Sequence, residues 1–156
     1  MYTTRAFIGP VVAPGKKHEP KFLGALCCIV INLLGQCIMF RIRKSFQFSA
    51  SHQLQGLPDS HPCSRLHGHN YEVIIELASD TLNSTGFVRD YRELADFKVY
   101  IDEELDHRHL NDVLGAENTT AERLAKHLYH WSKNRWPEVS AVSVSETPKT
   151  WAEYRP

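Results

Sequence analysis

The chain has little cysteine beyond its first 38 residues. Three of its four cysteines, Cys27, Cys28 and Cys37, lie in that first stretch, and Cys63 is the only cysteine in residues 39–156. A single cysteine cannot form an internal disulfide, so this longer part is typical of a protein kept in a reducing compartment such as the cytoplasm. Cys63 is therefore a candidate reactive thiol.

The chain also lacks an excess of positive charge. It holds 18 Lys and Arg against 18 Asp and Glu, and residues 1–38 contain four of the bases and one of the acids. The remaining 14 bases and 17 acids give residues 39–156 a net charge of about −3 with His neutral. This balance argues against a nucleic acid or an anionic membrane surface as the main partner. With 42% apolar and 23% charged residues and no internal repeats, 156 residues suit one globular domain.

Long hydrophobic runs are scarce, and the one present, Leu23–Phe40, is broken by polar and small residues. It is marginal for a membrane-spanning helix, and no clear small-residue cleavage site follows it. Three interpretations stay open: an artefact upstream of a true start at Met39, which we favour, a signal or membrane anchor, or a genuine appended segment. We therefore expect an atypical N-terminal extension at residues 1–38 and a folded domain at residues 39–156.

The periodicity of apolar residues changes along the folded part. Strands alternate every second residue, helices repeat every three to four, and Pro and Gly mark the loops. A capping box, with Thr119 as the cap and Glu122 three residues later, marks the start of one helix. The expected elements are strands at 40–52 and 67–78, a helix at 90–105, a loop at 106–111, a helix from near Thr119 to before Pro137, and a hairpin of strands at 141–146 and 151–154.

This order, strand-strand-helix-helix-strand-strand, indicates the α+β class. Without regular alternation of strands and helices, the favoured architecture is a four-stranded antiparallel sheet with two helices on one face. The two edges of such a sheet are commonly covered by pairing with another subunit.

Histidines concentrate where the second strand should begin. His67 and His69 are two residues apart, so on a strand both imidazoles face the same side. Gly68 puts no side chain on the other face and leaves room for close backbone packing. His52, at the end of the first strand, is the natural third ligand. Three imidazoles with an open fourth position are the ligand set of a catalytic zinc, so we predict a zinc site.

A different class of protein is compatible with the same residues. If Cys63 joined His52, His67 and His69 as a fourth ligand, the site would be closed and the protein would be a structural zinc-binding module. A third class, a membrane-anchored binding protein, would use Leu23–Phe40 as its anchor.

Six short motifs follow one another along the folded part. They are Phe48-Ser-Ala-Ser-His52, Cys63-x3-His67-Gly-His69-Asn-Tyr71, Gly86-Phe-Val-Arg-Asp90-Tyr, Leu105-Asp106-His107-Arg-His-Leu110-Asn111, Thr120-Ala-Glu122 and Val144-Ser-Glu146-Thr147. In this order they resemble the 6-pyruvoyl-tetrahydropterin synthase family, over nearly all of the chain after Met39. The resemblance implies the tunnelling (T-) fold and a homo-oligomer that closes into a barrel, expected to be a hexamer, with active sites between subunits. The three-residue spacing between Cys63 and His67 is more similar to the queuosine-pathway branch, the 6-carboxytetrahydropterin synthases.

The resemblance also implies a substrate, 7,8-dihydroneopterin triphosphate, and a cytoplasmic pterin-synthase-like catalytic domain at residues 39–156. Cys63 would be the base and His107 would exchange its proton, with Asp106 orienting that imidazole. Glu146 would anchor the pterin by paired hydrogen bonds, and Thr120 would assist. The product would be 6-carboxy-5,6,7,8-tetrahydropterin, with release of acetaldehyde and triphosphate; the alternative is 6-pyruvoyl-tetrahydropterin. Arg65, Arg108 and Lys149 are candidates for binding the triphosphate, and the sequence does not choose among them.

Overall fold

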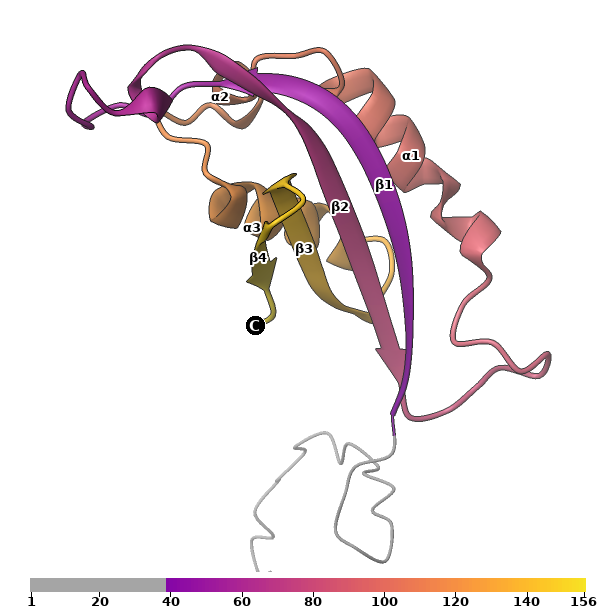
Figure 1. Ribbon diagram of the computed structural model, residues 1–156. Helices are drawn as coiled ribbons and strands as arrows, with labels where there is room; N and C mark the ends of the chain where they lie inside the picture. Colours follow the sequence, from indigo (N-terminus) through magenta and orange to yellow (C-terminus); the bar gives the residue numbers. More distant parts are fainter. Residues whose placement is uncertain (1–38) are drawn as a thin grey trace, which may run out of the picture.

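The computed structural model describes residues 39–156. They form a four-stranded antiparallel sheet in the order β1-β2-β3-β4 (Figure 1), so the predicted α+β class and its four strands are confirmed. The expectations for residues 1–38 and for nearly all of Leu23–Phe40 lie outside the described residues. Among the described helices, none is both long and apolar enough to cross a bilayer. The strands are β1 (Phe40–His52), β2 (His67–Ser79), β3 (Val139–Thr147) and β4 (Thr150–Tyr154).

The two long strands alternate as their sequences predict. In β1, Phe46 and Phe48 are buried while Gln47 between them is exposed, and in β2 the core-facing positions include Tyr71 and Val73. The register pairs Phe46 with Val73 and Phe48 with Tyr71. Apolar residues at every second position of both strands thus share one face, because directly opposite residues of an antiparallel pair project to the same side.

The helical segments are more divided than the sequence predicts. The expected helix at 90–105 is a 3₁₀ turn η2 (Tyr91–Leu94), α1 (Ala95–Tyr100) and a π-helical turn η3 (Ile101–Leu105). The end of the expected loop at 106–111 belongs to an additional short helix, α2 (Leu110–Leu114), which ends at Gly115 with a φ of 58°. Left-handed backbone of this kind favours glycine, and it ends helices commonly.

The last helix, α3 (Ala121–Lys133), is capped by Thr120 rather than by Thr119 as expected. The Thr120 hydroxyl accepts a hydrogen bond from the backbone N–H of Arg123 at 3.4 Å. Thr119 is instead fully buried, one residue before the helix. Both threonines are good caps, and the packing of Thr119 against the end of β1 decides between them.

Both long helical segments cover the same face of the sheet, as predicted. Phe97 of α1 packs edge-on against Phe46 of β1 with ring centroids 4.9 Å apart, and it contacts Trp131 of α3 at 5.6 Å. Tyr129 of α3 packs against Tyr154 of β4 at 5.2 Å. In Figure 1, α1 lies along β1 and α3 lies along β3 and β4, so one continuous core joins the two helices to the sheet.

Gly68 lies where β1 and β2 approach closely. A Cβ added to Gly68 would meet the carbonyl oxygen of Ala50 on β1 at 3.1 Å, which is tighter than ordinary contact. The predicted role of this glycine, to leave room for close backbone packing between the two metal-ligand positions, is therefore confirmed.

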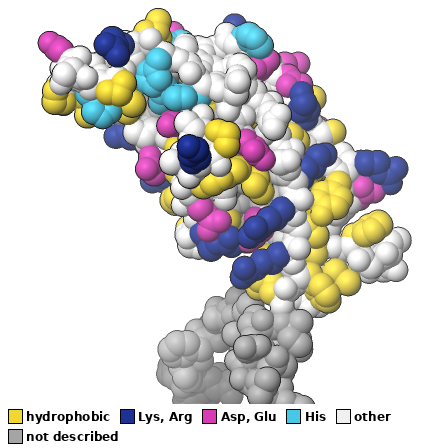
Figure 2. All heavy atoms as spheres, viewed as in Figure 1, with side chains coloured by type: hydrophobic (Ala, Val, Ile, Leu, Met, Phe, Trp, Pro, Cys, Tyr) yellow, Lys and Arg dark blue, Asp and Glu magenta, His cyan; other side chains and the backbone are white. Residues whose placement is uncertain are grey.

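The opposite face of the sheet carries a buried carboxylate. The side chain of Glu76 on β2 is 3% exposed. It accepts hydrogen bonds from Arg155 at 2.6 Å, from Arg43 at 2.8 Å and from the Ser140 hydroxyl at 2.9 Å. Hydrogen bonds from Arg155, and then from Arg43 and Ser140, outweigh burial and lower the pKa of Glu76 from 4.5 to about 2. Figure 2 shows Lys and Arg side chains gathered at the lower end of this view and His side chains near the upper end.

Acid should therefore weaken the fold through Glu76. Because the folded-state pKa is depressed, the stabilisation is complete above pH 4.5 and is lost as the pH falls towards 2. The shift corresponds to at most about 3 kcal/mol in the free energy of unfolding. We expect Glu76→Gln to remove this part of the pH dependence in urea unfolding between pH 6 and 3. The control Glu93→Gln, at an exposed ion pair with Arg89, should retain it, and equal slopes in both variants would contradict the assignment to Glu76.

Candidate metal centre and active site

The three histidines of the predicted metal site meet at one end of the sheet. The register sets His52 of β1 opposite His67 of β2 and sets Ala50 opposite His69, so the imidazoles occupy adjacent cross-strand rows. Their ring centroids are 4.5 Å (His52–His67), 4.9 Å (His67–His69) and 5.1 Å (His52–His69) apart. One candidate ligand atom from each ring lies within 4.8 Å of the others. This group can hold a metal ion.

Backbone carbonyls fix the tautomers of two of the rings. Nδ1 of His52 donates to the carbonyl oxygen of Thr119 at 2.6 Å, and Nδ1 of His67 donates to that of Arg65 at 2.7 Å. In the neutral rings Nε2 then carries a lone pair, and the two Nε2 atoms face each other at 3.0 Å. Two lone pairs this close repel unless a cation lies between them. Metal-binding histidines are commonly oriented in this way by an acceptor on the other ring nitrogen.

The third ring also presents an unpaired nitrogen. Nε2 of His69 is buried and has no hydrogen-bond partner among the described residues. Burial, followed by the charges of His52 and His67, lowers the pKa of His69 against the opposing effect of Glu146, which favours the neutral ring that a metal needs. Three imidazole nitrogens without other partners, two of them preoriented, fit a resident metal ion.

A cavity of about 360 Å³ adjoins this cluster and brings four of the predicted site residues together. His52, Cys63, Thr120 and Glu146 all line it. Its walls come from β1, the loop after β1, the start of α3 and the β3–β4 hairpin, which are far apart in the sequence. Leu54, Ala121, Glu122, Thr150, Trp151 and Ala152 complete the lining.

Cys63 is held in the cavity wall by a short 3₁₀ turn, η1 (Pro62–Ser64). His61 caps this turn because its Nδ1 accepts from the backbone N–H of Cys63 at 3.1 Å. Cys63 does not belong to the group of ligand atoms formed by the three histidines within residues 39–156. The thiol therefore lies beside the cluster rather than in it.

Glu146 of β3 and Thr120 at the start of α3 both line the cavity. The carboxylate of Glu146 is 3.9 Å from Nδ1 of His52, and its side chain is 26% exposed. The hydroxyl of Thr120 caps α3, and the residue lines the cavity. A carboxylate that is partly accessible in the wall of a cavity can accept hydrogen bonds from a ligand.

Asp106 and His107 lie elsewhere in the same chain, beyond the free edge of β1. The backbone N–H of Asp106 donates to the carbonyl of Ile101 at 2.9 Å, which is the last bond of the π-helical turn. His107 then has a φ of 57°, an uncommon conformation for a non-glycine residue. This reversal lets Asp106 Oδ2 accept from His107 Nδ1 at 2.8 Å, although the two residues are adjacent. Strained backbone of this kind often occurs at functional sites.

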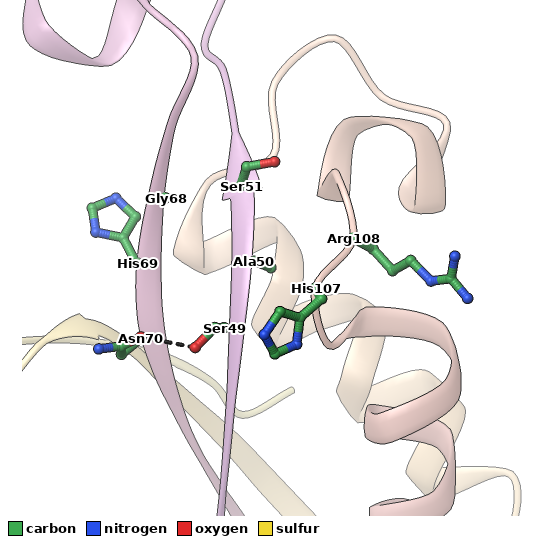
Figure 3. A pocket seen from close by; sticks show the side chains of 8 residues that line it. All are labelled: Ser49, Ala50, Ser51, Gly68, His69, Asn70, His107 and Arg108. Atoms are coloured by element: carbon green, nitrogen blue, oxygen red, sulfur yellow. Dashed lines mark hydrogen bonds between the residues drawn. The ribbon is translucent and has the colours of Figure 1, made fainter.

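The loop that carries this pair is fastened to β1. Asp106 Oδ1 accepts from the backbone N–H of Ser49 at 2.8 Å, and this bond, followed by that from His107, lowers the pKa of Asp106. Figure 3 shows His107 on one side of the β1–β2 pair and His69 on the other. The imidazole of His107 is 81% exposed. Neither Asp106 nor His107 lines the Cys63 cavity in one chain, although His107 and His69 both line another cavity that runs over Gly68.

Of the three candidates for binding triphosphate, Arg108 lines a second cavity of about 440 Å³ together with His107. In Figure 3 its guanidinium extends away from the strands. Arg65 follows the turn that holds Cys63, and its backbone carbonyl accepts the hydrogen bond from His67 Nδ1. Lys149 lies in the exposed turn between β3 and β4.

Sequence reasoning did not assign a role to Tyr71 or to the carbonyl of Thr119. Alternation along a strand, which puts His67 and His69 on one face, also puts Tyr71 on that face, so the sequence did indicate that Tyr71 lies near the histidines. The contact between Thr119 and His52 spans 67 positions, and nothing local in the sequence indicates it.

Fold and site together define a candidate metalloenzyme of the α+β class, with three imidazoles on neighbouring strands beside a cavity that holds a thiol and a carboxylate. The chain belongs to the 6-pyruvoyl tetrahydropterin synthase family, whose family model matches residues 41–156. The predicted membership and the predicted enzymatic, lyase class are thereby confirmed.

Relatives and solved structures agree with this assignment. The 6-carboxy-5,6,7,8-tetrahydropterin synthase of Synechocystis sp. is 36% identical over 122 residues, covering 74% of this chain and 93% of the relative. The enzyme of the same name from Bacillus subtilis is 32% identical over 130 residues, covering 75% and 86%.

The structure of Caenorhabditis elegans 6-pyruvoyl tetrahydropterin synthase aligns with a TM-score of 0.67 at 24% identity, covering 76% of this chain and 96% of that one. The corresponding Plasmodium vivax structure gives 0.61 at 17%, covering 76% and 98%. At these identities the structures establish the T-fold of the chain.

Proposed function

We propose that this protein is a zinc-dependent lyase in queuosine and 7-deazapurine biosynthesis. It converts 7,8-dihydroneopterin triphosphate and one water into 6-carboxy-5,6,7,8-tetrahydropterin, acetaldehyde and triphosphate. The observation that carries the proposal is the single cavity in which His52 of the metal-ligand cluster, Cys63, Thr120 and Glu146 meet. The names of the Synechocystis and Bacillus subtilis relatives support the carboxy product.

Zinc suits the ligand set, because three neutral imidazoles leave the full charge of the ion and one coordination position available. His52, His67 and His69 would hold it. When bound, it supplies a positive charge that stabilises negative charge developing on the side chain of the substrate.

The protein's own groups would bind the pterin and move its protons. Glu146 accepts hydrogen bonds from the ring N–H and the 2-amino group, and Thr120 assists at the start of α3. Cys63 Sγ accepts the proton that leaves the substrate side chain. His107 exchanges that proton through its Nε2, while Asp106 holds Nδ1 and fixes the tautomer.

The separation of the Asp106–His107 pair from the Cys63 cavity supports a site shared between subunits. We propose that a second copy supplies the pair to each cavity, within a homo-oligomer expected to be a hexamer. The high exposure of His107 and the two edge strands, β1 and β4, leave surfaces for such contacts.

Cys63 is the only cysteine in residues 39–156, which supports a cytoplasmic location.

A structural zinc module is disfavoured because Cys63 lies outside the cluster of ligand atoms in the described chain. The sister activity, which makes 6-pyruvoyl-tetrahydropterin, would use the same residues, and the products distinguish the two.

The test is product analysis of the full chain with zinc and 7,8-dihydroneopterin triphosphate. We expect 6-carboxytetrahydropterin and acetaldehyde in equal amounts, measured by chromatography and by a coupled aldehyde assay. Pyruvoyltetrahydropterin without acetaldehyde would assign the sister activity instead. Absence of turnover by zinc-loaded protein would contradict the lyase proposal.

A further inference from the structure

One row of side chains crosses the sheet between the metal cluster and the core. Phe48 of β1 lies opposite Tyr71 of β2. The last pair of the β2–β3 register is Glu72 with Ser145, so Tyr71 and Glu146 are the next residues along the two strands. Directly opposite residues of an antiparallel pair have Cβ atoms about 4.5–5.5 Å apart and project to the same face. Tyr71 is therefore the cross-strand neighbour of the proposed pterin anchor.

Tyr71 carries a hydroxyl that nothing satisfies. The residue is 1% exposed, and its hydroxyl has no hydrogen-bond partner among the described residues. The ring cannot turn to find one, because it is stacked on Phe48 at 5.0 Å with an interplanar angle of 12°. The rings of His52 and His69 meet it edge-on at 6.2 and 5.6 Å. Buried hydroxyls without partners are uncommon in proteins and call for an explanation.

A candidate acceptor, the carboxylate of Glu146, lies on the neighbouring strand β3. No described residue donates a hydrogen bond to it, since Nδ1 of His52, at 3.9 Å, already donates to Thr119. A phenol with its ordinary pKa of about 10 is protonated at neutral pH, so the hydroxyl is a hydrogen-bond donor. A buried donor without an acceptor and a carboxylate without a donor thus lie on neighbouring strands.

We propose that Tyr71 is a positioning residue for Glu146: in the ligand-bound site its hydroxyl donates to one carboxylate oxygen and fixes the plane of the carboxylate that receives the pterin ring. This inference rests on the proposed function. A carboxylate oxygen has two lone pairs, so it can accept from Tyr71 and from the ligand together. The bond holds the anchor in one orientation before the substrate reaches its transition state, so it contributes to binding more than to the chemical step.

The test is Tyr71→Phe in the full chain, which removes one oxygen and keeps the ring stacked. Neopterin, followed by its own fluorescence, is the binding probe. We expect its Kd to rise about ten- to a hundredfold, as for loss of a hydrogen bond to a charged group. With dihydroneopterin triphosphate, KM should rise with little change in kcat. The Tm without ligand should stay the same or rise, because an unpaired buried hydroxyl is removed.

Tyr100→Phe is the matched control. The Tyr100 hydroxyl is bonded to Nε2 of His127 at 2.7 Å, so its removal should lower the Tm and leave neopterin binding unchanged. Glu146→Ala completes a double-mutant cycle: if Tyr71 acts through Glu146, adding Tyr71→Phe to Glu146→Ala should weaken binding no further.

Four results would overturn the inference. If Tyr71→Phe lowers the Tm and leaves neopterin binding unchanged, the hydroxyl is structural. If it weakens binding equally with and without Glu146, it acts on the ligand directly. If the wild-type protein neither binds neopterin nor turns over the triphosphate, the proposed function is contradicted, and the inference with it. If the wild-type protein binds neopterin and Tyr71→Phe binds it equally well, only the inference is overturned.

Discussion

Cys63→Ala is expected to lower the turnover of dihydroneopterin triphosphate by about 10²–10⁴-fold, the usual contribution of a positioned general base. The zinc content should remain at the wild-type value, because the thiol lies outside the group formed by His52, His67 and His69. Steady-state rates and metal analysis of the same preparation measure both quantities. Loss of zinc together with activity would contradict the assignment and would indicate that Cys63 is a ligand.

A mixing experiment sharpens this prediction. Chains that carry Cys63→Ala should lack the base, and chains that carry His107→Ala should lack its proton-exchange partner. If each cavity receives His107 from a neighbouring copy, mixed oligomers contain some sites with both residues intact. Activity should therefore return when the two inactive variants are unfolded together and refolded. If no activity returns from mixed oligomers, both residues must act from the same chain.

His52→Ala is expected to weaken zinc binding by about a hundredfold or more, as loss of one of a few ligands removes several kcal/mol. Protein purified without added metal should contain almost none, and turnover should fall with it. Inductively coupled plasma mass spectrometry and a competition titration with a chromophoric chelator give the content and the affinity.

His109→Ala is the control for this variant, because His109 is an imidazole outside the cluster that bonds the Ser51 hydroxyl at 3.2 Å. It should keep wild-type zinc content. The His52 variant also loses the contact with the Thr119 carbonyl, so circular dichroism should verify that it remains folded. Full zinc content in folded His52→Ala protein would exclude this imidazole as a ligand.

The sheet could be predicted closely because its signals are local. Phe46 and Phe48 alternate with polar neighbours, and the strand β1 begins and ends where that alternation does. His67 and His69 could likewise be placed together, because a strand fixes the side on which residues two apart project. His52 joined them through the antiparallel pairing of β1 with β2, which follows once both strands are recognised.

The remaining features depend on contacts between distant segments. Thr119 and Thr120 are equally good caps in sequence, and burial of Thr119 against His52 selects Thr120. The positive φ of His107 and the widened turn before Asp106 arise where the chain is fastened to β1. No local pattern predicts that the Asp106–His107 pair and the Cys63 cavity are separate in one chain, since this is a property of the whole topology.

The positions of His52 and His67 have a consequence for the loop at 53–66 between them. These two residues are the last of β1 and the first of β2, and they are paired in register. A single ion bound to both histidines would link the two ends of the loop, so the loop would have less conformational freedom than without the ion. Cys63 lies inside the linked segment. Binding of the metal would thus also fix the position of Cys63. Removal of the ion would make the loop at 53–66 accessible to proteases before the rest of the sheet unfolds.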